Sequence, residues 1–323
     1  MVLEIILILV GFVVVLWGAD RFTDGACGLA RKFRVSELVI GLTVVALGTS
    51  LPEFMVSFMS VLRGSSDMSV GNIIGSNVFN ILVITGLSAI LTPLAVDKHL
   101  LRRDIPLCFA ASALLLLFAL TNGTIERWEG LLFVAFFACY LYVAYRVAMN
   151  DRHIASDLTS VTECDDEQCE AMKKEQRLWF LIMLILVGTA ALVLGARLLV
   201  NNAALVARAL GISESVIGLT VLAAGTSLPE LATSLVAAHK GRSGLALGNV
   251  IGSNIFNIAF VIGLCGSIVP MKVTEISIVD WVAFIGSATL VWLTAFTRRQ
   301  LSRWEGMLLV VSYVAFLAVL ITS

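Results

Sequence analysis

The chain is a succession of long apolar runs separated by short polar stretches. An α-helix needs about 20 mainly apolar residues to cross the hydrocarbon core of a bilayer, and the runs have about this length. Ten such runs occur, at residues 3–29, 36–62, 69–92, 105–121, 128–148, 178–207, 213–239, 245–269, 277–296 and 305–321. The pattern predicts an all-α polytopic membrane protein with ten transmembrane helices, five on each side of a polar segment.

The two sets of five runs are copies of one another. Residues 41–87 return as residues 218–264 without a gap, at an offset of 177, and about half of the aligned positions are identical. Chance does not produce such similarity over this length. We therefore expect a first five-helix repeat at residues 1–149, an acidic cytoplasmic linker at 150–177 and a second repeat at 178–323.

An odd number of helices in each repeat fixes the relative orientation of the repeats. Five helices end on the side opposite to their start, so the second repeat is predicted to be inverted with respect to the first. Inverted repeats place a substrate site near the bilayer midplane, at their interface. Of the 22 Lys and Arg residues, sixteen fall in the loops of one side and four in those of the other. The positive-inside rule then puts the first side in the cytoplasm and both termini outside.

Composition narrows the class of protein. With 59% apolar residues, 14% charged residues and a mean hydropathy of +0.97, the chain is too apolar for a soluble domain. The net charge of -1 is uninformative about nucleic acid, and no basic stripe indicates it, so we expect no nucleic-acid partner. No His, Cys or Ser set of catalytic type gathers in the apolar runs, so we expect no enzyme. Nothing predicts a prosthetic group or an obligate protein partner, and the lipid bilayer is the surrounding medium.

A carboxylate recurs at matched positions inside the apolar runs. Glu53 follows Pro52 in the segment GTSLPE, and Glu230 follows Pro229 in the second copy of that segment. An ionised group at mid-membrane costs at least about 2.5 kcal/mol, so such residues face a partner or a water-filled cavity and mark ion paths. Because helix packing needs no charge, the Glu pair is the candidate centre of a cation site.

Oxygen-bearing groups accompany each Glu. Thr49 and Ser50 precede Glu53 on one helical face, and Ser76 and Asn80 lie one turn apart in a second segment. Proline removes a backbone donor, so carbonyls near Ala46 and Ala223 are expected to be released from helical pairing. The second repeat offers the corresponding Thr226, Ser227, Ser253 and Asn257.

An oxygen-only set suits hard cations, since Ca²⁺ takes six to eight oxygens, whereas soft transition metals prefer thiolate or imidazole. Two ionised Glu residues balance one Ca²⁺, and the additional oxygens could hold several Na⁺ instead. For the small Ser and Gly residues, close helix packing without ion binding is an equally good interpretation.

The same segments predict breaks in four helices. The sequence GTSLP is expected to interrupt the second and seventh helices, and residues 71–80 and 248–257 to disturb the third and eighth. Three further charges, Asp20, Asp24 and Arg197, also fall within predicted spans, where we expect structural ion pairs or snorkelling rather than transport.

The GTSLPE and GNxxGSNxFN segments, each present twice, resemble the paired alpha repeats of the cation/calcium exchanger superfamily, and within it the prokaryotic sodium/calcium exchangers, which are calcium/sodium antiporters. The resemblance extends over nearly the whole chain outside the linker. It implies a multi-pass protein of the prokaryotic plasma membrane, in which helices two, three, seven and eight surround the site and helices one and six slide past it. The ion ligands that it implies are Glu53, Glu230, Thr49, Thr226, Ser50, Ser227, Ser76, Ser253, the carbonyls of Ala46 and Ala223, and Asn80 and Asn257 at the two central positions.

One departure from the family leaves the counter-ion open. Some members that exchange Na⁺ for Ca²⁺ carry an Asp at one central position, whereas this chain has Asn80 and Asn257. The doubly amide arrangement resembles members that exchange Ca²⁺ for protons, so the predicted function is a Ca²⁺/Na⁺ antiporter with a Ca²⁺/H⁺ antiporter as the alternative. A cation channel would not need inverted repeats. A sensor acting through the linker lacks an EF-hand pattern.

Overall fold

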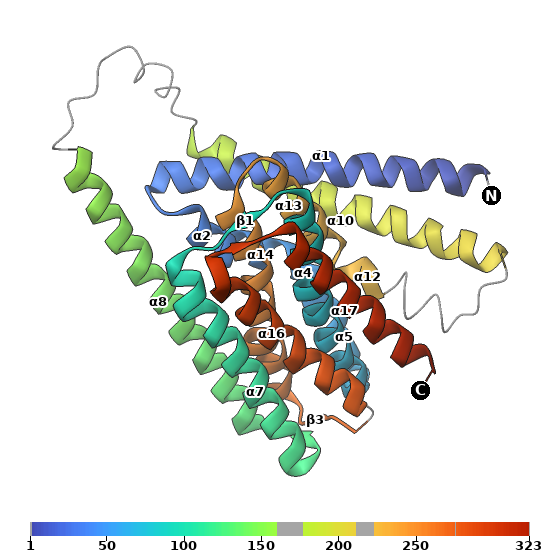
Figure 1. Ribbon diagram of the computed structural model, residues 1–323. Coiled ribbons are helices and arrows are strands. Elements are labelled where there is room, and N and C mark those ends of the chain that lie inside the picture. The colour runs from blue at the N-terminus through green and yellow to red at the C-terminus, as the bar shows by residue number, and fades with distance from the viewer. Residues whose placement is uncertain (1, 160–176, 211–222, 275, 323) are drawn as a thin grey trace.

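The structure, a computed structural model, describes residues 2–159, 177–210, 223–274 and 276–322. The described chain is a helical bundle in which α1 (Val2–Phe33) and α10 (Leu178–Ala209) lie side by side along one edge (Figure 1). The other long helices form the body of the bundle. The labels α, η and β denote α-helices, π-helical turns and strands.

The remaining elements of the first half are α2 (Glu37–Ile40), η1 (Gly41–Val45), α3 (Ala46–Thr49), α4 (Leu51–Leu62), α5 (Ser66–Phe79), η2 (Asn80–Ile84), α6 (Thr85–Leu91), β1 (Leu94–Ala95), η3 (Leu100–Asp104), α7 (Ile105–Asn122), β2 (Thr124–Ile125) and α8 (Arg127–Thr159). Those of the second half are α12 (Ala223–Thr226), α13 (Leu228–His239), α14 (Ser243–Ile255), η5 (Phe256–Ile262), α15 (Gly263–Ile268), β3 (Met271–Lys272), α16 (Ile278–Arg298), β4 (Gln300–Leu301) and α17 (Arg303–Thr322).

The predicted spans correspond closely to these elements. Within the described residues, eight helices are long and apolar enough to cross a membrane, and the pair Glu37–Thr49 and Leu51–Leu62, bent by 48°, is a ninth candidate. The seventh predicted run, 213–239, is described only from Ala223 onward, because residues 211–222 lie outside the described part.

The last helix of the first half extends into the predicted linker at 150–177. Helix α8 continues to Thr159, beyond the predicted span end at residue 148. No Gly or Pro occurs between Gly130 and Gly188, so neither of the two strongest helix-ending residues stops α8 near residue 148. The rest of the linker, including Cys164 and Cys169, falls in residues 160–176, outside the described residues.

The distortion predicted for the third and eighth spans begins only at the end of the predicted segments and continues beyond them. Residues 71–79 and 248–255 are regular α-helix, and the π-helical turns begin only at Asn80 and Phe256. The glycines of α14 serve packing instead. A Cβ at Gly248 would lie 2.8 Å from the Leu38 carbonyl oxygen, and one at Gly252 would lie 2.7 Å from that of Leu42. Glycine therefore lets the backbone of α2 and η1 approach α14.

Glycines also line the contact between α1 and α10. A Cβ at Gly188 would lie 2.7 Å from the Phe22 backbone nitrogen, and one at Gly18 would lie 2.9 Å from that of Leu192. Small residues allow this close approach, which van der Waals packing makes favourable in lipid. The two helices thus meet backbone to backbone.

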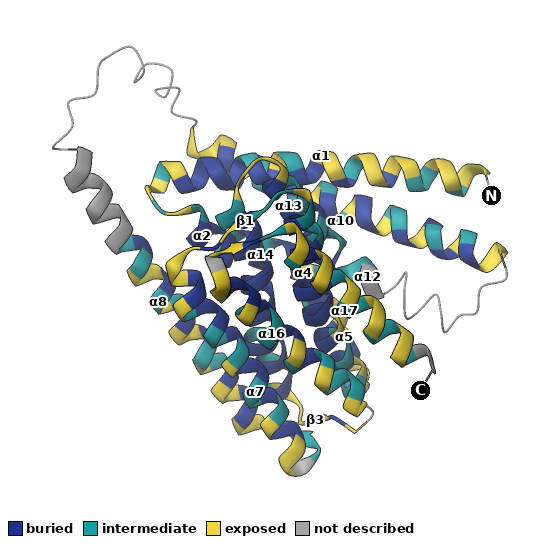
Figure 2. Ribbon diagram, viewed as in Figure 1, coloured by how far each residue is buried: buried dark blue, intermediate teal, exposed yellow. Residues whose placement is uncertain are grey.

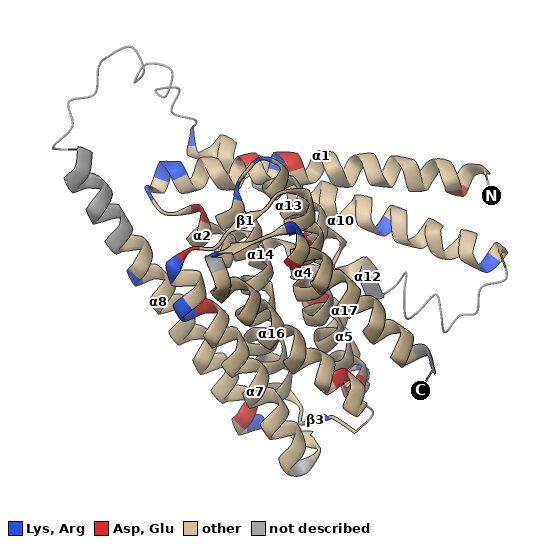
Figure 3. Ribbon diagram, viewed as in Figure 1, with Lys and Arg blue, Asp and Glu red and all other residues tan. Residues whose placement is uncertain are grey.

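Charged residues are sparse along the bundle (Figure 3). The Lys240 ammonium lies 2.7 Å from Asp20 Oδ1 and 2.6 Å from Asp24 Oδ1, which joins α1 to the turn after α13. Burial of this ammonium opposes its charge, but hydrogen bonds from it to the two carboxylates outweigh burial and raise the pKa of Lys240. The predicted structural ion pairing is confirmed for Asp20 and Asp24, while Arg197 is exposed on α10.

Two short antiparallel ribbons join the halves of the chain. Strand β1 pairs with β4, and β2 pairs with β3. Most residues of the span Ser243–Ile268 are buried, and this span forms the centre of the bundle, whereas most residues of Arg303–Leu320 are not buried and this helix lies at the periphery (Figure 2). The most buried helix is therefore one of the two that carry the GNxxGSNxFN segments.

A glycine substitution tests the close contact of α1 and α10. We expect Gly188→Ala to lower the melting temperature in detergent, because overpacking costs about 1–3 kcal/mol. The matched control is Gly286→Ala, at an exposed helical glycine with nothing within 4 Å of a Cβ, where alanine should stabilise by up to about 1 kcal/mol. Equal melting temperatures for the two variants would contradict this account of the contact.

Candidate cation site

Both predicted helix breaks at the GTSLP segments are present. Helix α3 ends at Thr49, Ser50 leaves the helical conformation, and α4 starts at Leu51. Pro52 then occupies the first turn of α4, where no backbone N–H is required. Glu53 also lies in this first turn, so its carboxylate is at the positive end of the helix dipole.

The second repeat is built in the same way. Helix α12 ends at Thr226, and α13 starts at Leu228 with Pro229 and Glu230 in its first turn. Ala223 lies in α12, as Ala46 lies in α3, and it is the first residue described there.

The carbonyl of Ala46 is not released from helical pairing, since it accepts the Ser50 N–H at 3.0 Å. The carbonyl that Pro52 leaves without its helical donor is that of Gly48, four residues before the proline. Ala46 retains a second lone pair, so the hydrogen bond does not exclude it as a ligand.

The two carboxylates are held by hydroxyls of the opposite repeat. Ser50 donates from Oγ to Glu230 Oε1 at 2.8 Å, and Ser227 donates from Oγ to Glu53 Oε1 at 2.9 Å. All four side chains are fully buried. Two copies related by a two-fold axis make equivalent contacts in both directions. The two serine bonds follow this rule, so each repeat contributes one serine and one glutamate to the site.

The threonines lie beside the same carboxylates. Thr49 contacts Glu230, and Thr226 contacts Glu53. The Thr49 hydroxyl also lies 3.2 Å from the Val45 carbonyl oxygen. The structure thus brings the predicted hydroxyls to the predicted carboxylates.

Four asparagines form a second reciprocal set. Asn80 donates from Nδ2 to Asn254 Oδ1 at 3.1 Å, and Asn257 donates from Nδ2 to Asn77 Oδ1 at 3.1 Å. Asn77 donates in turn to the carbonyl of Asn254 at 3.3 Å, and Asn254 to the carbonyl of Asn77 at 3.2 Å. These bonds fasten α5 to α14 at the start of the π-helical turns.

Six buried oxygens of the predicted ligands have no hydrogen-bond partner among the described residues. They are Oε2 of Glu53 and Glu230, Oγ of Ser76 and Ser253, and Oδ1 of Asn80 and Asn257. A buried acceptor without a donor costs about 1–3 kcal/mol. The elements that carry these oxygens, α4, α5, α13 and α14 with their adjoining turns, pack against one another. Such a set of oxygens suits a hard cation.

Sequence reasoning missed the residues that brace this site. Asn77 and Asn254 were not among the predicted ligands, and neither were the pairs that clamp neighbouring helices. Asn72 donates to Ser57 at 3.1 Å, and Asn249 donates to Ser234 at 2.9 Å. The signal was present, because each of these residues recurs at the offset of 177.

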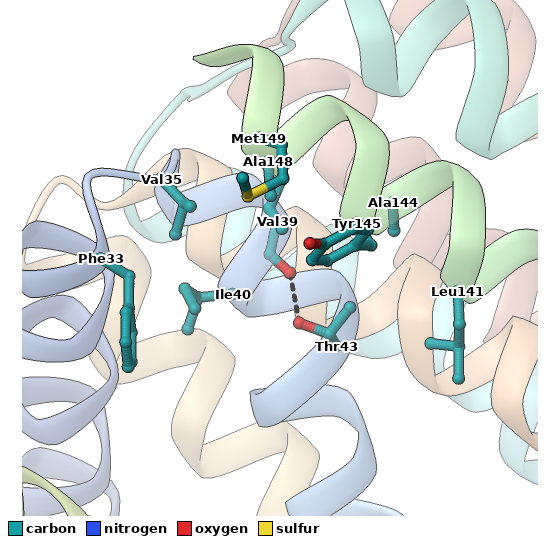
Figure 4. Close-up of a pocket in the computed structure, with 10 residues that line it drawn as sticks. All are labelled: Phe33, Val35, Val39, Ile40, Thr43, Leu141, Ala144, Tyr145, Ala148 and Met149. Carbon is teal, nitrogen blue, oxygen red and sulfur yellow. Dashed lines mark hydrogen bonds between the residues drawn. The ribbon is translucent and has the colours of Figure 1, made fainter. Parts of the chain in front are cut away.

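A separate cavity of about 490 Å³ lies between α2, η1 and α8 (Figure 4). Its lining is mainly apolar, and the hydroxyl of Thr43 there donates to the Val39 carbonyl at 2.6 Å. No carboxylate lines it, so this cavity does not share the chemistry of the Glu53 and Glu230 site.

These features define a class, a multi-pass membrane protein with a buried, oxygen-lined site formed by two related halves. The chain matches the family described as sodium/calcium exchanger protein at residues 3–146 and 180–322, once in each repeat. The chain therefore belongs to the sodium/calcium exchanger protein family.

Individual relatives match along their whole length. CaxA of Alkalimonas amylolytica is 38% identical over 328 residues, which cover 100% of both chains. The sodium/calcium exchanger MaX1 of Methanosarcina acetivorans is 33% identical over 346 residues, covering 98% of this chain and 97% of MaX1. Among solved structures, the sodium-calcium exchanger NCX_Mj soaked with Na⁺ and Ca²⁺ is similar with a TM-score of 0.82 and 31% identity, covering 98% of each chain.

The crossed serine bonds can be tested by stability. We expect Ser227→Ala to lower the melting temperature in Ca²⁺-free detergent solution, because a buried Glu53 oxygen loses its donor at a cost of about 1–3 kcal/mol. The control is Ser112→Ala. Among the described residues, that buried hydroxyl donates only to the Cys108 carbonyl of its own helix, so its loss should cost about 1 kcal/mol or less. A smaller shift for Ser227→Ala than for Ser112→Ala would contradict the assignment.

Proposed function

We propose that this chain is a secondary active antiporter that exchanges Ca²⁺ for Na⁺ across the prokaryotic plasma membrane. The observation that carries the proposal is the reciprocal binding of Glu53 and Glu230 by hydroxyls of opposite repeats, beside buried oxygens that lack a donor. Membership of an exchanger family and the likeness to NCX_Mj soaked with Na⁺ and Ca²⁺ support it.

In this proposal the cation occupies the interface of two inverted five-helix repeats, residues 1–149 and 178–323, joined by the linker at 150–177. The chain crosses the membrane ten times, with both termini outside, and access to the site alternates between the two sides. Its ligands are Glu53, Glu230, Thr49, Thr226, Ser50, Ser227, Ser76, Ser253, Asn80, Asn257 and the carbonyls of Ala46 and Ala223.

Charge balance governs the transport cycle. The two carboxylates together carry a charge of -2, which one Ca²⁺ neutralises. The empty dianionic site is too costly to carry across the membrane, so the site crosses only when it is loaded. A required load on both journeys produces exchange rather than uniport.

A second candidate, exchange of Ca²⁺ for protons, rests on the two central amides. Asn80 and Asn257 cannot take up a proton at transport pH. In a proton exchanger, protons would therefore load onto Glu53 and Glu230.

Transport into proteoliposomes separates the candidates. We expect an outward Na⁺ gradient to drive ⁴⁵Ca²⁺ uptake, because Na⁺ leaving the lumen frees the site for Ca²⁺. Vesicles with equal Na⁺ on both sides and empty vesicles are the controls. Uptake with a pH gradient and none with a Na⁺ gradient would select the proton exchanger, and uptake without any counter-ion would select a channel.

Substitution of one carboxylate tests the site. Loss of one buried charge costs about 2–5 kcal/mol of cation binding, so Glu53→Gln should reduce ⁴⁵Ca²⁺ uptake about 30-fold or more. The matched control is Glu129→Gln. This buried Glu accepts the Glu126 N–H at 2.8 Å outside the site, and a Gln oxygen can accept the same bond. Normal transport by Glu53→Gln would refute the assignment.

A further inference from the structure

Each of the two amides at the centre of the site, those of Asn80 and Asn257, can bind a cation only through its oxygen. An amide oxygen is an acceptor and can ligate Ca²⁺, whereas the amide nitrogen carries two donor hydrogens that repel it. The direction in which Asn80 and Asn257 present their amides therefore determines whether they contribute to binding.

The direction of the Asn80 amide follows from a backbone group. The Asn254 side chain lies 3.2 Å from the carbonyl oxygen of Asn77. A carbonyl only accepts, so Asn254 must turn its nitrogen towards it, and its oxygen Oδ1 must then face the other way. There it accepts Nδ2 of Asn80 at 3.1 Å. The Asn80 oxygen is left pointing away from Asn254, buried and without a donor.

The same sequence of bonds fixes the other amide. Asn77 turns its nitrogen to the carbonyl of Asn254 at 3.3 Å, so its oxygen faces Asn257 and accepts Nδ2 at 3.1 Å. The Asn257 oxygen is then the free end. Both orienting side chains are buried, with 1% exposure for Asn77 and none for Asn254.

We propose that Asn77 and Asn254 are positioning residues that lock the amide oxygens of Asn80 and Asn257 towards the transported cation. This inference rests on the proposed function. Each set of bonds crosses the interface of the repeats twice. Asn80 of the first repeat is oriented by Asn254 of the second, and Asn254 is oriented in turn by the backbone carbonyl of Asn77 in the first. Neither half can set its own central ligand.

The locks act through binding and not through the maximal rate. With Asn254 truncated, the Asn80 amide can rotate and present its nitrogen to the cation. Residues that orient metal ligands in this way typically contribute about 10- to 100-fold in affinity. A carboxylate in place of Asn80 has an oxygen on both sides, so orientation by Asn254 would no longer matter.

The experiment compares Asn254→Ala in two backgrounds, with ⁴⁵Ca²⁺ uptake measured over a range of Ca²⁺ concentrations. In the wild-type background we expect the half-saturating Ca²⁺ concentration to rise about tenfold or more, with the maximal rate retained. In the Asn80→Asp background we expect Asn254→Ala to leave this concentration unchanged or to lower it. The carboxylate that replaces the Asn80 amide would face Asn254 Oδ1, an acceptor, and truncation removes that repulsion.

An equal rise in both backgrounds would show that Asn254 only supports packing and would overturn the inference, as would no change in the wild-type background. Absence of Ca²⁺ uptake by the wild-type protein would refute the proposed function instead. Should Asn254→Ala fail to fold in detergent, the mirror pair Asn77→Ala and Asn257→Asp provides the same comparison, with the same two outcomes for and against.

Discussion

The burial of two carboxylates in one apolar bundle is the constraint on which the rest of the structure depends. Glu53 and Glu230 are both fully buried, and each receives a hydroxyl donor from the opposite repeat. The donors, Ser50 and Ser227, are also the residues at which their own helices break. The same residue therefore interrupts its helix and donates the hydrogen bond to the carboxylate of the other repeat. Because each half supplies what the other half lacks, separate halves would leave a buried carboxylate without its donor.

Reciprocity extends outward from the carboxylates. The asparagine bonds join α5 and η2 of the first repeat to α14 and η5 of the second, and the two short ribbons pair β1 with β4 and β2 with β3. At the edge of the bundle, α1 meets α10 through facing glycines, where Gly18 and Gly188 leave no room for a Cβ. Shape complementarity between backbones must hold these helices together, since lipid provides little hydrophobic drive for helix association.

Much of this arrangement could be predicted from the chain. Apolar run length placed the described spans, and the duplication identified Glu53 with Glu230 as a pair. The role of Asn77 could not be predicted, because the sequence does not say which end of an amide faces which neighbour. The start of the π-helical turn only at Asn80 depends on packing. The continuation of α8 to Thr159 depends on the absence of Gly and Pro after Gly130. The length of the apolar runs predicts neither the position of this turn nor the end of this helix.

The two central amides have a consequence for energetics. In the proposed cation site, Asn80 and Asn257 add oxygens without adding charge, so Glu53 and Glu230 alone set the charge of that proposed site. If three Na⁺ load against one Ca²⁺, the sodium form carries one net positive charge while the calcium form is neutral. Each cycle then couples to the membrane potential by about 2.3 kcal/mol per 100 mV. Two protons on the same carboxylates would neutralise the site and abolish that coupling. The identity of the counter-ion therefore determines whether transport depends on the membrane voltage.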